Sequence, residues 1–312
     1  MNGKQESRQT GGTEKKKRWL SPAVLRNLPE LLIFIGPVFV IYTLFFTVPF
    51  LQGIYYSLTD WNGLNPVVNF TGLANYRRMF LEDTIFLDSL KVTFRFTVWN
   101  VVLTNIIAML FAVALTSNFR LNNLFRATIF LPNMISMVVA GFIWLFMFTK
   151  ISPAVYGITG LEVFGRSWLG VPENVIFSIV VVSLWHGVGY IMTIYIAGLQ
   201  GIDESLIEAA AIDGAGAWQT FWRIKLPVML PTITVGAFIN IAGSLKIFDI
   251  VMSLTGGGPG RASEMAMINI YREAFVTNNM AYGSAKATFL ALIIILVAAL
   301  QFRFTSGREV KH

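Results

Sequence analysis

Residues 205–231 read SLIEAAAIDGAGAWQTFWRIKLPVMLP and form the longest stretch between hydrophobic runs that keeps an ordered composition. Ser205 and Glu208 stand at the spacing of a capping box, which predicts the start of a helix. Alanines continue this helix, and Gly214 stands where a left-handed residue most easily ends it. A second helical stretch follows and meets Pro227, which must end or kink it because proline lacks the amide donor. The segment therefore predicts a helix, a break and a second helix.

The composition of the chain places it in a membrane. Hydrophobic residues make up 55% of the 312 residues and charged residues only 13%, against roughly 25% charged residues in a typical soluble domain. The net charge of +7 would suit a nucleic-acid partner, but the basic residues lie between long apolar runs and not in one patch interleaved with aromatic residues. The excess of positive charge on the inner side of membrane proteins explains it more simply. We expect contact with lipid and no nucleic-acid partner.

Six apolar runs are long enough to cross a bilayer, which takes about 20 residues of helix. The first, from Leu31 to about Tyr56, is too long for a signal peptide and has no cleavage site. Polar side chains inside the runs are tolerated where they face a bundle interior. The fold class predicted is an all-α integral membrane protein with about six transmembrane helices. The other five runs are placed at 92–115, 125–148, 174–198, 229–254 and 286–304, and their asparagines are Asn100, Asn105, Asn133 and Asn240.

The basic residues predict the orientation of these spans. An even number of spans puts both termini on one side, together with the 116–124 and 199–228 loops. That side collects the Lys15-Lys16-Lys17-Arg18 cluster and several arginines, whereas basic residues on the other side are mixed with acidic ones. We expect both termini in the cytoplasm. The predicted organisation is a disordered basic leader at 1–29, a transmembrane permease domain at 30–304 with a cytoplasmic loop at 199–228, and a cytoplasmic tail at 305–312.

Catalytic and metal-binding patterns are missing from the sequence. Cysteine is absent, and His186 and His312 are the only histidines, which leaves no disulfide framework and no histidine metal cluster. The sequence has no Ser-His-Asp order, no nucleophile elbow, no paired acid cluster and no P-loop. We therefore expect neither enzymatic activity nor a cofactor or metal in this chain.

Three motifs carry a resemblance to a known family. The residues of the opening segment from Glu208 to Pro227 resemble the EAA loop of ABC-importer permeases, with the spacing of that family. The FTGLANY stretch at 70–76 resembles the F-x-G-L-x-N-Y stretch of sugar-importer permeases, and TGGGPG at 255–260 resembles their T-x-G-G-P loop. Over roughly residues 30–304, the chain resembles a binding-protein-dependent ABC importer permease of the carbohydrate-uptake, maltose-type family.

This resemblance implies a fold, partners and a coupling site. The fold would be that of a type I ABC importer permease in the bacterial cytoplasmic (inner) membrane. The partners would be a second, homologous permease in a heterodimer, an ATPase dimer that binds ATP and Mg²⁺, an extracytoplasmic sugar-binding protein and the sugar. The loop would dock as a coupling helix into a groove on the ATPase. The implied ATPase-coupling residues are Glu208, Ala209, Ala210, Asp213, Gly214, Ile224, Leu226 and Pro227.

Polar and aromatic residues inside the spans are candidates for a solute pathway. Those of the fourth span stand at helical spacing and can share one face, as can the two of the fifth span. Amides, hydroxyls and aromatic rings are the groups that bind sugars, although small polar residues also serve simply to pack spans together. The candidates are Ser183, His186, Gly187 and Tyr190 in the fourth span, Asn240 and Ser244 in the fifth, and Asn133 after the kink expected at Pro132.

Two charged residues in the fifth span bear on the choice between alternative functions. Lys246 and Asp249 lie three residues apart, and because a lone charge in a span is costly we expect a mutual ion pair. A proton relay, which would suit a proton-coupled secondary carrier, is the alternative. A permease for glycerol phosphates should carry Arg or Lys in its cavity, and the predicted cavity faces have neither. The leading hypothesis is therefore the permease subunit of an ATP-driven importer for a sugar, most of all an oligosaccharide.

Overall fold

The computed structural model of the protein describes residues 28–117 and 120–306. Almost all of the predicted leader and residues 307–312 of the predicted tail lie outside this part of the chain. The described residues form helices, apart from loops and one isolated bridge between Thr59 and Phe70. The predicted all-α class is confirmed.

Two units are distinguished, residues 1–52 and residues 53–312, and each is described by itself. The first contains α2 (Leu28–Tyr42), the π-helical turn η1 (Thr43–Thr47) and the start of α3 (Val48–Tyr56). Together these elements run without interruption, and residues 33–56 form a 24-residue apolar helix long enough to cross a membrane. This helix corresponds to the first predicted span.

The second unit contains the remaining elements. In chain order they are α4 (Ala74–Leu81), α5 (Thr84–Thr116), α6 (Asn122–Phe130), the 3-10 turn η2 (Leu131–Met134), α7 (Met137–Phe146), the π-helical turn η3 (Met147–Ile151), α8 (Ser152–Thr159), α9 (Glu162–Gly165), α10 (Pro172–Gln200), α11 (Glu204–Ile212), α12 (Ala217–Thr220), the π-helical turn η4 (Phe221–Lys225), α13 (Leu226–Val228), α14 (Leu230–Leu245), α15 (Asp249–Leu254), α16 (Ala266–Tyr271), the π-helical turn η5 (Arg272–Val276) and α17 (Met280–Ser306).

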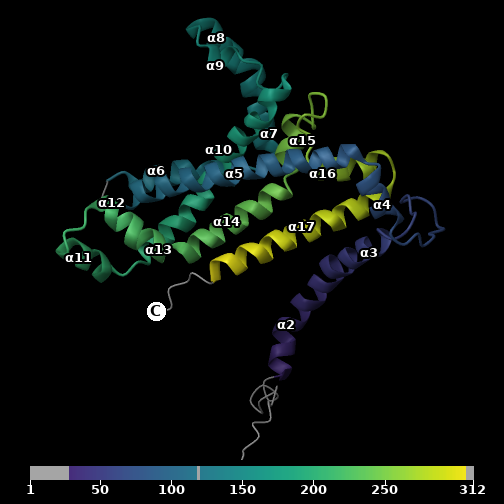
Figure 1. Ribbon diagram of the computed structural model, residues 1–312, viewed down its shortest axis with the longest axis horizontal. Helices are drawn as coiled ribbons and strands as arrows, with labels where there is room; N and C mark the ends of the chain where they lie inside the picture. The colour runs from purple at the N-terminus through teal and green to yellow at the C-terminus, as the bar shows by residue number, and fades with distance from the viewer. Residues whose placement is uncertain (1–27, 118–119, 307–312) are drawn as a thin grey trace, which may run out of the picture. The chain divides into compact units, whose positions relative to one another are not determined.

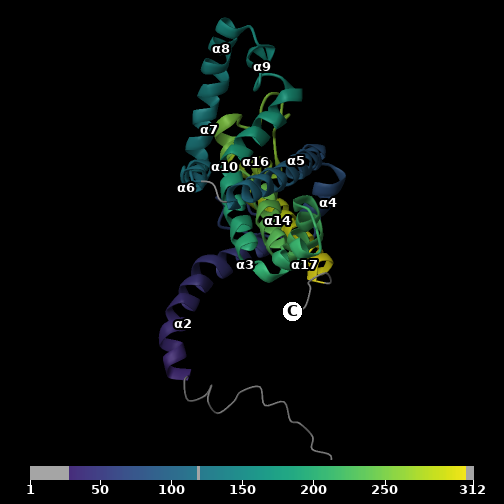
Figure 2. The same ribbon diagram turned by 90° about the vertical axis from the view of Figure 1, so that its left-hand side faces the viewer.

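Helix α5 is the central element of the second unit. It packs against α10 along much of its length and also against α14, which in turn packs against α17. Figure 1 shows α11 and α12 near one end of α5 and α4 and α16 near the other. Helices α7 and α8 extend away from α5, and α9 folds back beside α8 (Figure 2). The two ends of the bundle therefore carry different loops.

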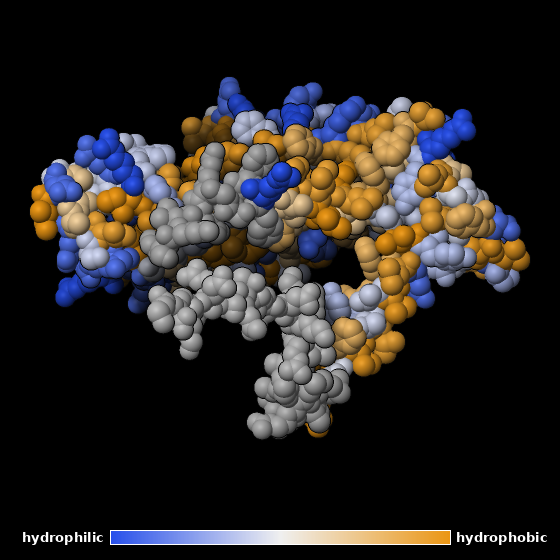
Figure 3. All heavy atoms as spheres, turned by 60° about the horizontal axis from the view of Figure 1, so that its bottom comes forward, coloured by the Kyte–Doolittle hydropathy of each residue, from blue (hydrophilic) through white to orange (hydrophobic). Residues whose placement is uncertain are grey.

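Figure 3 shows how polarity is distributed over one face of the molecule. Hydrophobic residues cover much of the middle of this face, and hydrophilic residues gather toward its left-hand end, where α11 and α12 lie. Among the described residues, five helices are long and apolar enough to span a membrane, or six if the bent pair of 217–228 and 230–245 is one span. This number agrees with the six spans predicted.

Two predicted spans are interrupted. The third, expected at 125–148, is broken by Pro132 and by extended backbone at Ile135 and Ser136, and the apolar helix after the break runs over residues 137–159. The fifth, expected at 229–254, ends as α14 at Leu245 and resumes as α15 at Asp249. The kink expected at Pro132 is confirmed, because a proline and two extended residues cannot continue an α-helix. The expectation of one continuous helix over 229–254 is wrong.

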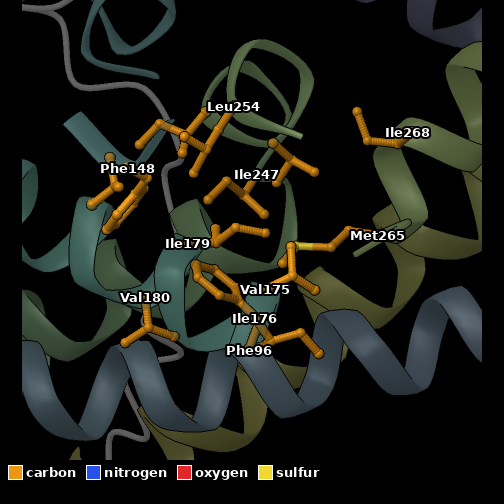
Figure 4. Packing of buried hydrophobic residues seen from close by; sticks show 13 residues of the cluster. Phe96, Phe148, Val175, Ile176, Ile179, Val180, Ile247, Leu254, Met265 and Ile268 are labelled. Carbon is orange, nitrogen blue, oxygen red and sulfur yellow. The ribbon is translucent and has the colours of Figure 1, made fainter. Parts of the chain in front are cut away.

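A cluster of buried hydrophobic residues joins α5, α10 and the second half of the interrupted fifth span. Figure 4 shows Ile176 and Ile179 of α10 between Phe96 of α5 on one side and Ile247 and Leu254 on the other. Phe96 and Ile179 are fully buried. This packing fixes α15 against α10 although the span that carries it is broken.

The FTGLANY stretch fastens the chain after α3. The side-chain amide of Asn75 donates to the carbonyl oxygens of Ser57 and Thr59, at 2.9 and 2.8 Å. The hydroxyls of Tyr76 and Ser57 lie 2.8 Å apart, and Gly72 takes the positive φ that glycine favours, at 59°. Its glycine, asparagine and tyrosine thus each have a structural role.

Lys286 of α17 is the centre of a buried network of charged groups. Its side chain is 1% exposed, and its ammonium group lies 2.8 Å from the carboxylate of Asp83 and 2.9 Å from that of Glu273. It also donates to the side-chain oxygen of Asn269 at 2.9 Å. Burial opposes ionisation of Asp83, but hydrogen bonds from Lys286 and from the Phe86 amide outweigh it and hold the pKa of this carboxyl below its usual value. The network joins the starts of α5 and α17 to η5.

The same network extends to the TGGGPG loop. Asn269 donates to Glu264 at 2.8 Å, and Glu264, itself 2% exposed, receives a salt bridge from Arg272 at 2.5 Å. Arg272 also donates to the carbonyl of Gly256 at 2.5 Å. Gly256, Gly257 and Gly260 have positive φ. The loop is thereby tied to the same end of the bundle as Lys286.

Replacing Lys286 by Met should destabilise the protein by about 3–5 kcal/mol, because the carboxylates of Asp83 and Glu273 lose their cation while remaining largely buried. The measurement is thermal unfolding of the purified protein in detergent, followed by helical circular dichroism. Lys91→Met is the matched control, since Lys91 pairs with Asp88 where both side chains are mostly exposed, at 78% and 68%, and surface pairs contribute about 0–1 kcal/mol. Equal losses in both variants would contradict the assignment of a structural role to this network.

Candidate functional site

A cavity of about 310 Å³ lies where α5, α10 and α14 meet the two interruptions in the spans. All seven candidate pathway residues line it, although they come from three separate segments of the chain. Asn100, Thr104, Lys246 and Asp249 also line the cavity. The sequence analysis did not predict this. The seven are Asn133, Ser183, His186, Gly187, Tyr190, Asn240 and Ser244.

Helix α10 supplies one wall of the cavity. Tyr190 is 40% exposed and none of the hydrogen bonds among the described residues involves its hydroxyl. A Cβ atom built on Gly187 would meet nothing within 4 Å, so the missing side chain leaves open space beside the ring. One turn away Ser183 is 8% exposed. The wall thus offers an accessible aromatic ring and a buried hydroxyl.

His186 has a structural partner. Its Nε2 lies 2.9 Å from the carbonyl oxygen of Ile135, so the ring donates to a backbone group that the break between η2 and α7 leaves outside a helix. The side-chain amide of Asn133 donates to the carbonyl of His186 at 3.4 Å. Both residues border the cavity and also hold α10 to the break.

Three polar residues form a cluster between α5 and α14. The side-chain amide of Asn100 donates to Asn240 Oδ1 at 3.1 Å and to Ser244 Oγ at 2.9 Å. The Ser244 hydroxyl in turn lies 3.4 Å from Asn240 Oδ1. These contacts join two spans, so Asn240 and Ser244 serve in helix packing as well as in the cavity wall.

Four residues that line this cavity each have a buried polar atom without a partner among the described residues. These atoms are Asn100 Oδ1, Thr104 Oγ1, Ser183 Oγ and Asn240 Nδ2. The side chains of Asn100, Thr104 and Ser183 are 8%, 2% and 8% exposed. A buried polar atom without a hydrogen bond costs about 1–3 kcal/mol. These four atoms, on α5, α10 and α14, are polar groups beside the cavity that no contact among the described residues satisfies.

Lys246 and Asp249 do not form the predicted ion pair. Both side chains are exposed at the cavity, and none of the salt bridges among the described residues joins them. The prediction assumed a continuous helix, on which residues three apart are neighbours, but the helix is interrupted between them. The expectation that the cavity lacks Lys and Arg is wrong for the same reason.

The opening segment of the sequence forms α11 to α13. Helix α11 begins at Glu204, and its cap is Asp203, whose carboxylate accepts from the Ser205 amide at 2.9 Å. The predicted capping box of Ser205 and Glu208 is therefore wrong, because Asp203 already satisfies the first free amide. The hydrogen bond from the Ser205 backbone lowers the pKa of Asp203 from its usual value.

Gly214 ends α11 as predicted. Its φ is +76°, its amide donates to Ala211 at 3.1 Å, and the Ala215 amide donates to Ala210 at 2.9 Å. This pair of hydrogen bonds defines the Schellman motif, which requires a left-handed residue. The chain then turns into α12, η4 and α13, and a bend of 69° separates α13 from α14, two residues beyond Pro227.

A groove of about 550 Å³ lies between α11 and the segment formed by α12 and η4. Four of the predicted coupling residues line it, and the other four, Glu208, Gly214, Leu226 and Pro227, do not. Glu208 is exposed and has no salt bridge among the described residues. Ile212 and Trp218 are 86% and 73% exposed, an apolar surface that sequence reasoning missed. The predicted residues in the groove are Ala209, Ala210, Asp213 and Ile224.

No cluster of three or more His, Cys, Asp or Glu side chains with metal-site geometry occurs in residues 28–117 and 120–306. The chemistry available at the cavity is hydrogen bonding, ring stacking and charge. The segment α11–α13 offers a groove and exposed apolar side chains.

A bundle of apolar helices with a cavity at two interrupted spans, lined by polar and apolar residues, defines a multi-pass membrane transport protein. Residues 104–308 match the family described as "Binding-protein-dependent transport system inner membrane component", and the chain belongs to this family. It is thus a permease subunit of an ABC transport system and not itself an enzyme, which confirms the family predicted from the EAA-like loop.

Curated relatives agree with this assignment over most of their length. The chain is 38% identical to the probable starch degradation products transport system permease protein AmyD of Thermoanaerobacterium thermosulfurigenes, covering 89% of this chain and 94% of the relative. It is 32% identical to the multiple sugar-binding transport system permease protein MsmF of Streptococcus mutans, with 87% and 93% covered. It is 33% identical to the sn-glycerol-3-phosphate transport system permease protein UgpA of Agrobacterium fabrum, with 90% and 95% covered.

A solved structure has the same fold. A chain of a bacterial ABC transporter involved in the import of the acidic polysaccharide alginate superposes with a TM-score of 0.77 at 19% identity, with 91% of this chain and 97% of that chain covered. At this identity the likeness establishes the architecture, that of an ABC importer permease.

Two glycines on α10 allow a test of the cavity. Gly187→Leu should leave the thermal stability unchanged or raise it by up to about 1 kcal/mol, because the side chain enters open space and leucine favours a helix. Gly189→Leu, the matched variant two residues further along, should lose about 1–3 kcal/mol, because a Cβ there would lie 2.3 Å from the Ile129 carbonyl oxygen. Thermal unfolding in detergent measures both, and equal effects would contradict the cavity.

Proposed function

We propose that this chain forms the translocation pathway for a sugar, most of all an oligosaccharide, in an ATP-driven importer of the bacterial cytoplasmic membrane. The observation that carries the proposal is the cavity that Asn133, Ser183, His186, Gly187, Tyr190, Asn240 and Ser244 line, with four buried polar atoms that lack partners. A ligand rich in hydroxyl groups would supply the missing hydrogen bonds.

The composition of the cavity wall favours a sugar. Amide and hydroxyl groups bind the hydroxyls of a sugar, and the exposed ring of Tyr190 can stack on its apolar face. The polar groups are few and placed at defined points, as is usual in small-molecule sites. The names of two relatives, which refer to starch degradation products and to multiple sugars, support the same substrate class.

The proposed assembly contains a second, homologous permease, an ATPase dimer and an extracytoplasmic sugar-binding protein. The family description supports the binding protein, and a solved alginate transporter is in complex with a pentasaccharide-bound periplasmic protein. The groove at α11–α13 supports an ATPase contact. We propose that ATP and Mg²⁺ are bound by that ATPase and that this chain holds no cofactor, with both termini and α11–α13 in the cytoplasm.

In the proposed mechanism the ATPase works through α11–α13. Closure of the ATPase dimer on ATP would press the loops of the two permeases together and rock the spans from an inward-open to an outward-open arrangement. The binding protein would then release sugar into the cavity. A ligand that binds one arrangement better than the other shifts their populations by its differential affinity.

Glycerol phosphate is a second candidate substrate. Lys246 lines the cavity and could bind a phosphate group, which removes the sequence argument against this class. The relatives from Agrobacterium and other organisms whose names refer to sn-glycerol-3-phosphate support it as well.

Glu208→Lys should uncouple ATP hydrolysis from uptake while the complex still assembles. Glu208 is exposed and has no salt bridge among the described residues, so reversing its charge changes a surface contact and not the fold. The measurement is the ratio of sugar uptake to ATP hydrolysis in proteoliposomes, with an expected fall of at least tenfold. Glu162→Lys, an equally exposed glutamate of α9, is the control. Normal coupling in Glu208→Lys would rule out the docking role of this residue.

Tyr190→Ala should reduce sugar uptake about tenfold or more without loss of assembly, because it removes the exposed ring from the wall. Tyr190→Phe retains the ring and removes the hydroxyl. If stacking dominates, this variant should keep most of the uptake, and if hydrogen bonding dominates it should behave like Tyr190→Ala. Initial uptake rates in proteoliposomes, normalised to complex content, decide between them. Unchanged kinetics in both variants would remove Tyr190 from the pathway.

A further inference from the structure

We infer that Lys246 and Asp249 bind the transported solute directly and make the cavity selective for a neutral polyhydroxylated ligand over an anionic one. The inference rests on the proposed transport function and deepens it by naming the charge class of the substrate. It concerns two residues that sequence reasoning assigned to a mutual ion pair.

The interruption of the fifth span places both charges at the cavity. Lys246 follows the last residue of α14, and Asp249 is the first residue of α15. At the break, the amide of Ile247 reaches the Ser244 carbonyl only at 3.4 Å, whereas the amide of Met252 makes a regular bond to Phe248 at 2.8 Å. Irregular backbone at membrane depth is tolerated where it is buried in protein or lines a cavity. The break is therefore in keeping with a solute site.

Neither charge has a partner within the described chain. The five salt bridges of the described residues involve other residues. Among the side-chain hydrogen bonds of this part of the chain, none involves Lys246 Nζ or a carboxylate oxygen of Asp249. Lys286, by contrast, is a charged residue with a structural role, and its ammonium group contacts two carboxylates and an amide oxygen. Charged residues inside spans are rare and face a cavity or bundle interior. The exposure of Lys246 and Asp249 at the cavity fits binding better than folding.

The donors and acceptors of the wall define the ligand. Lys246 has only donors, and the Asp249 carboxylate has only acceptors. Of the unpartnered buried atoms, Asn240 Nδ2 donates, Asn100 Oδ1 accepts, and the hydroxyl of Ser183 does both. Every hydroxyl of a sugar also donates and accepts. A neutral saccharide can therefore satisfy both kinds of group at once.

The charge balance of the wall disfavours an anion. Lys246 and Asp249 cancel, so the cavity carries no net formal charge from its lining residues. A phosphate or uronate that entered the cavity to reach Lys246 would share it with the Asp249 carboxylate, and juxtaposed like charges weaken binding. Asp249 is thus the residue that excludes anions, and Lys246 provides donors without making the cavity cationic.

The experiment measures binding to the purified complete transporter in nanodiscs, without the binding protein, so that only the permease cavity selects. The probes are an equimolar mixture of neutral glucose, galactose and mannose trisaccharides, the corresponding uronate trisaccharides, and glycerol 3-phosphate. The wild type should bind the neutral mixture best. Asp249→Asn should raise the affinity for the two anionic probes about tenfold relative to the neutral mixture. Lys246→Met should weaken binding of the neutral mixture without this gain.

Lys91→Met and Asp88→Asn are the matched controls, since they remove a charge from an exposed pair and should leave all three affinities unchanged. If the wild type binds the neutral mixture but Asp249→Asn leaves the ratio of affinities unchanged, the inference is overturned while the proposed function stands. Preference of the wild type for an anionic probe, or dissociation of the complex in both cavity variants, overturns it as well. Binding of none of the probes overturns the proposed function together with the inference.

Discussion

The rest of the site depends on the hydrogen bond between His186 and the carbonyl of Ile135, which is 2.9 Å long and pairs a backbone group inside an apolar span. A backbone carbonyl in hydrocarbon must find a donor within the protein, since no water is there to supply one. Pro132 and the extended residues after it release such carbonyls in the middle of an apolar run. Because an imidazole on α10 meets one of them, the chain can change direction between α6 and α7 with the Ile135 carbonyl paired.

The cavity lies at this change of direction and at the second break, between α14 and α15. Gly187 of α10 and Gly243 of α14 both face open space, whereas Gly189 gives α6 the room to cross α10 closely, with a built Cβ only 2.3 Å from the Ile129 carbonyl oxygen. Close packing on one side of His186 and open space on the other follow from single glycines two residues apart. The polar site is thus a product of where the helices stop and not of any one motif.

Most of this site could be predicted from the sequence because α10 is one continuous helix. The residues from Ser183 to Tyr190 share one face of an unbroken helix, and counting by 3.6 residues placed them together correctly. It failed for Lys246 and Asp249 because the same counting was applied across a break that has no proline or glycine to announce it. Asn100 and Thr104 were missed although the sequence carries a signal for them. A stripe of polar residues at helical spacing forms the buried side of α5, namely Ser89, Thr93, Thr97, Asn100 and Thr104.

The loop α11–α13 is connected to the cavity by two helices that cannot move independently near it. Helix α10 leads into α11 through three residues, and α13 leads into α14 at the 69° bend. Close to the loop the two helices are held together: a Cβ on Gly198 would lie 2.8 Å from Thr232, and one on Gly236 would lie 2.8 Å from the ring of Tyr195. Tyr195 is fully buried and its hydroxyl bonds to Asn105 of α5. Because packed interiors do not deform continuously, we expect a displacement of α11–α13 to move α10 and α14 as a pair. The same two helices carry Tyr190 and Asn240 further along, so such a displacement would reach two walls of the cavity.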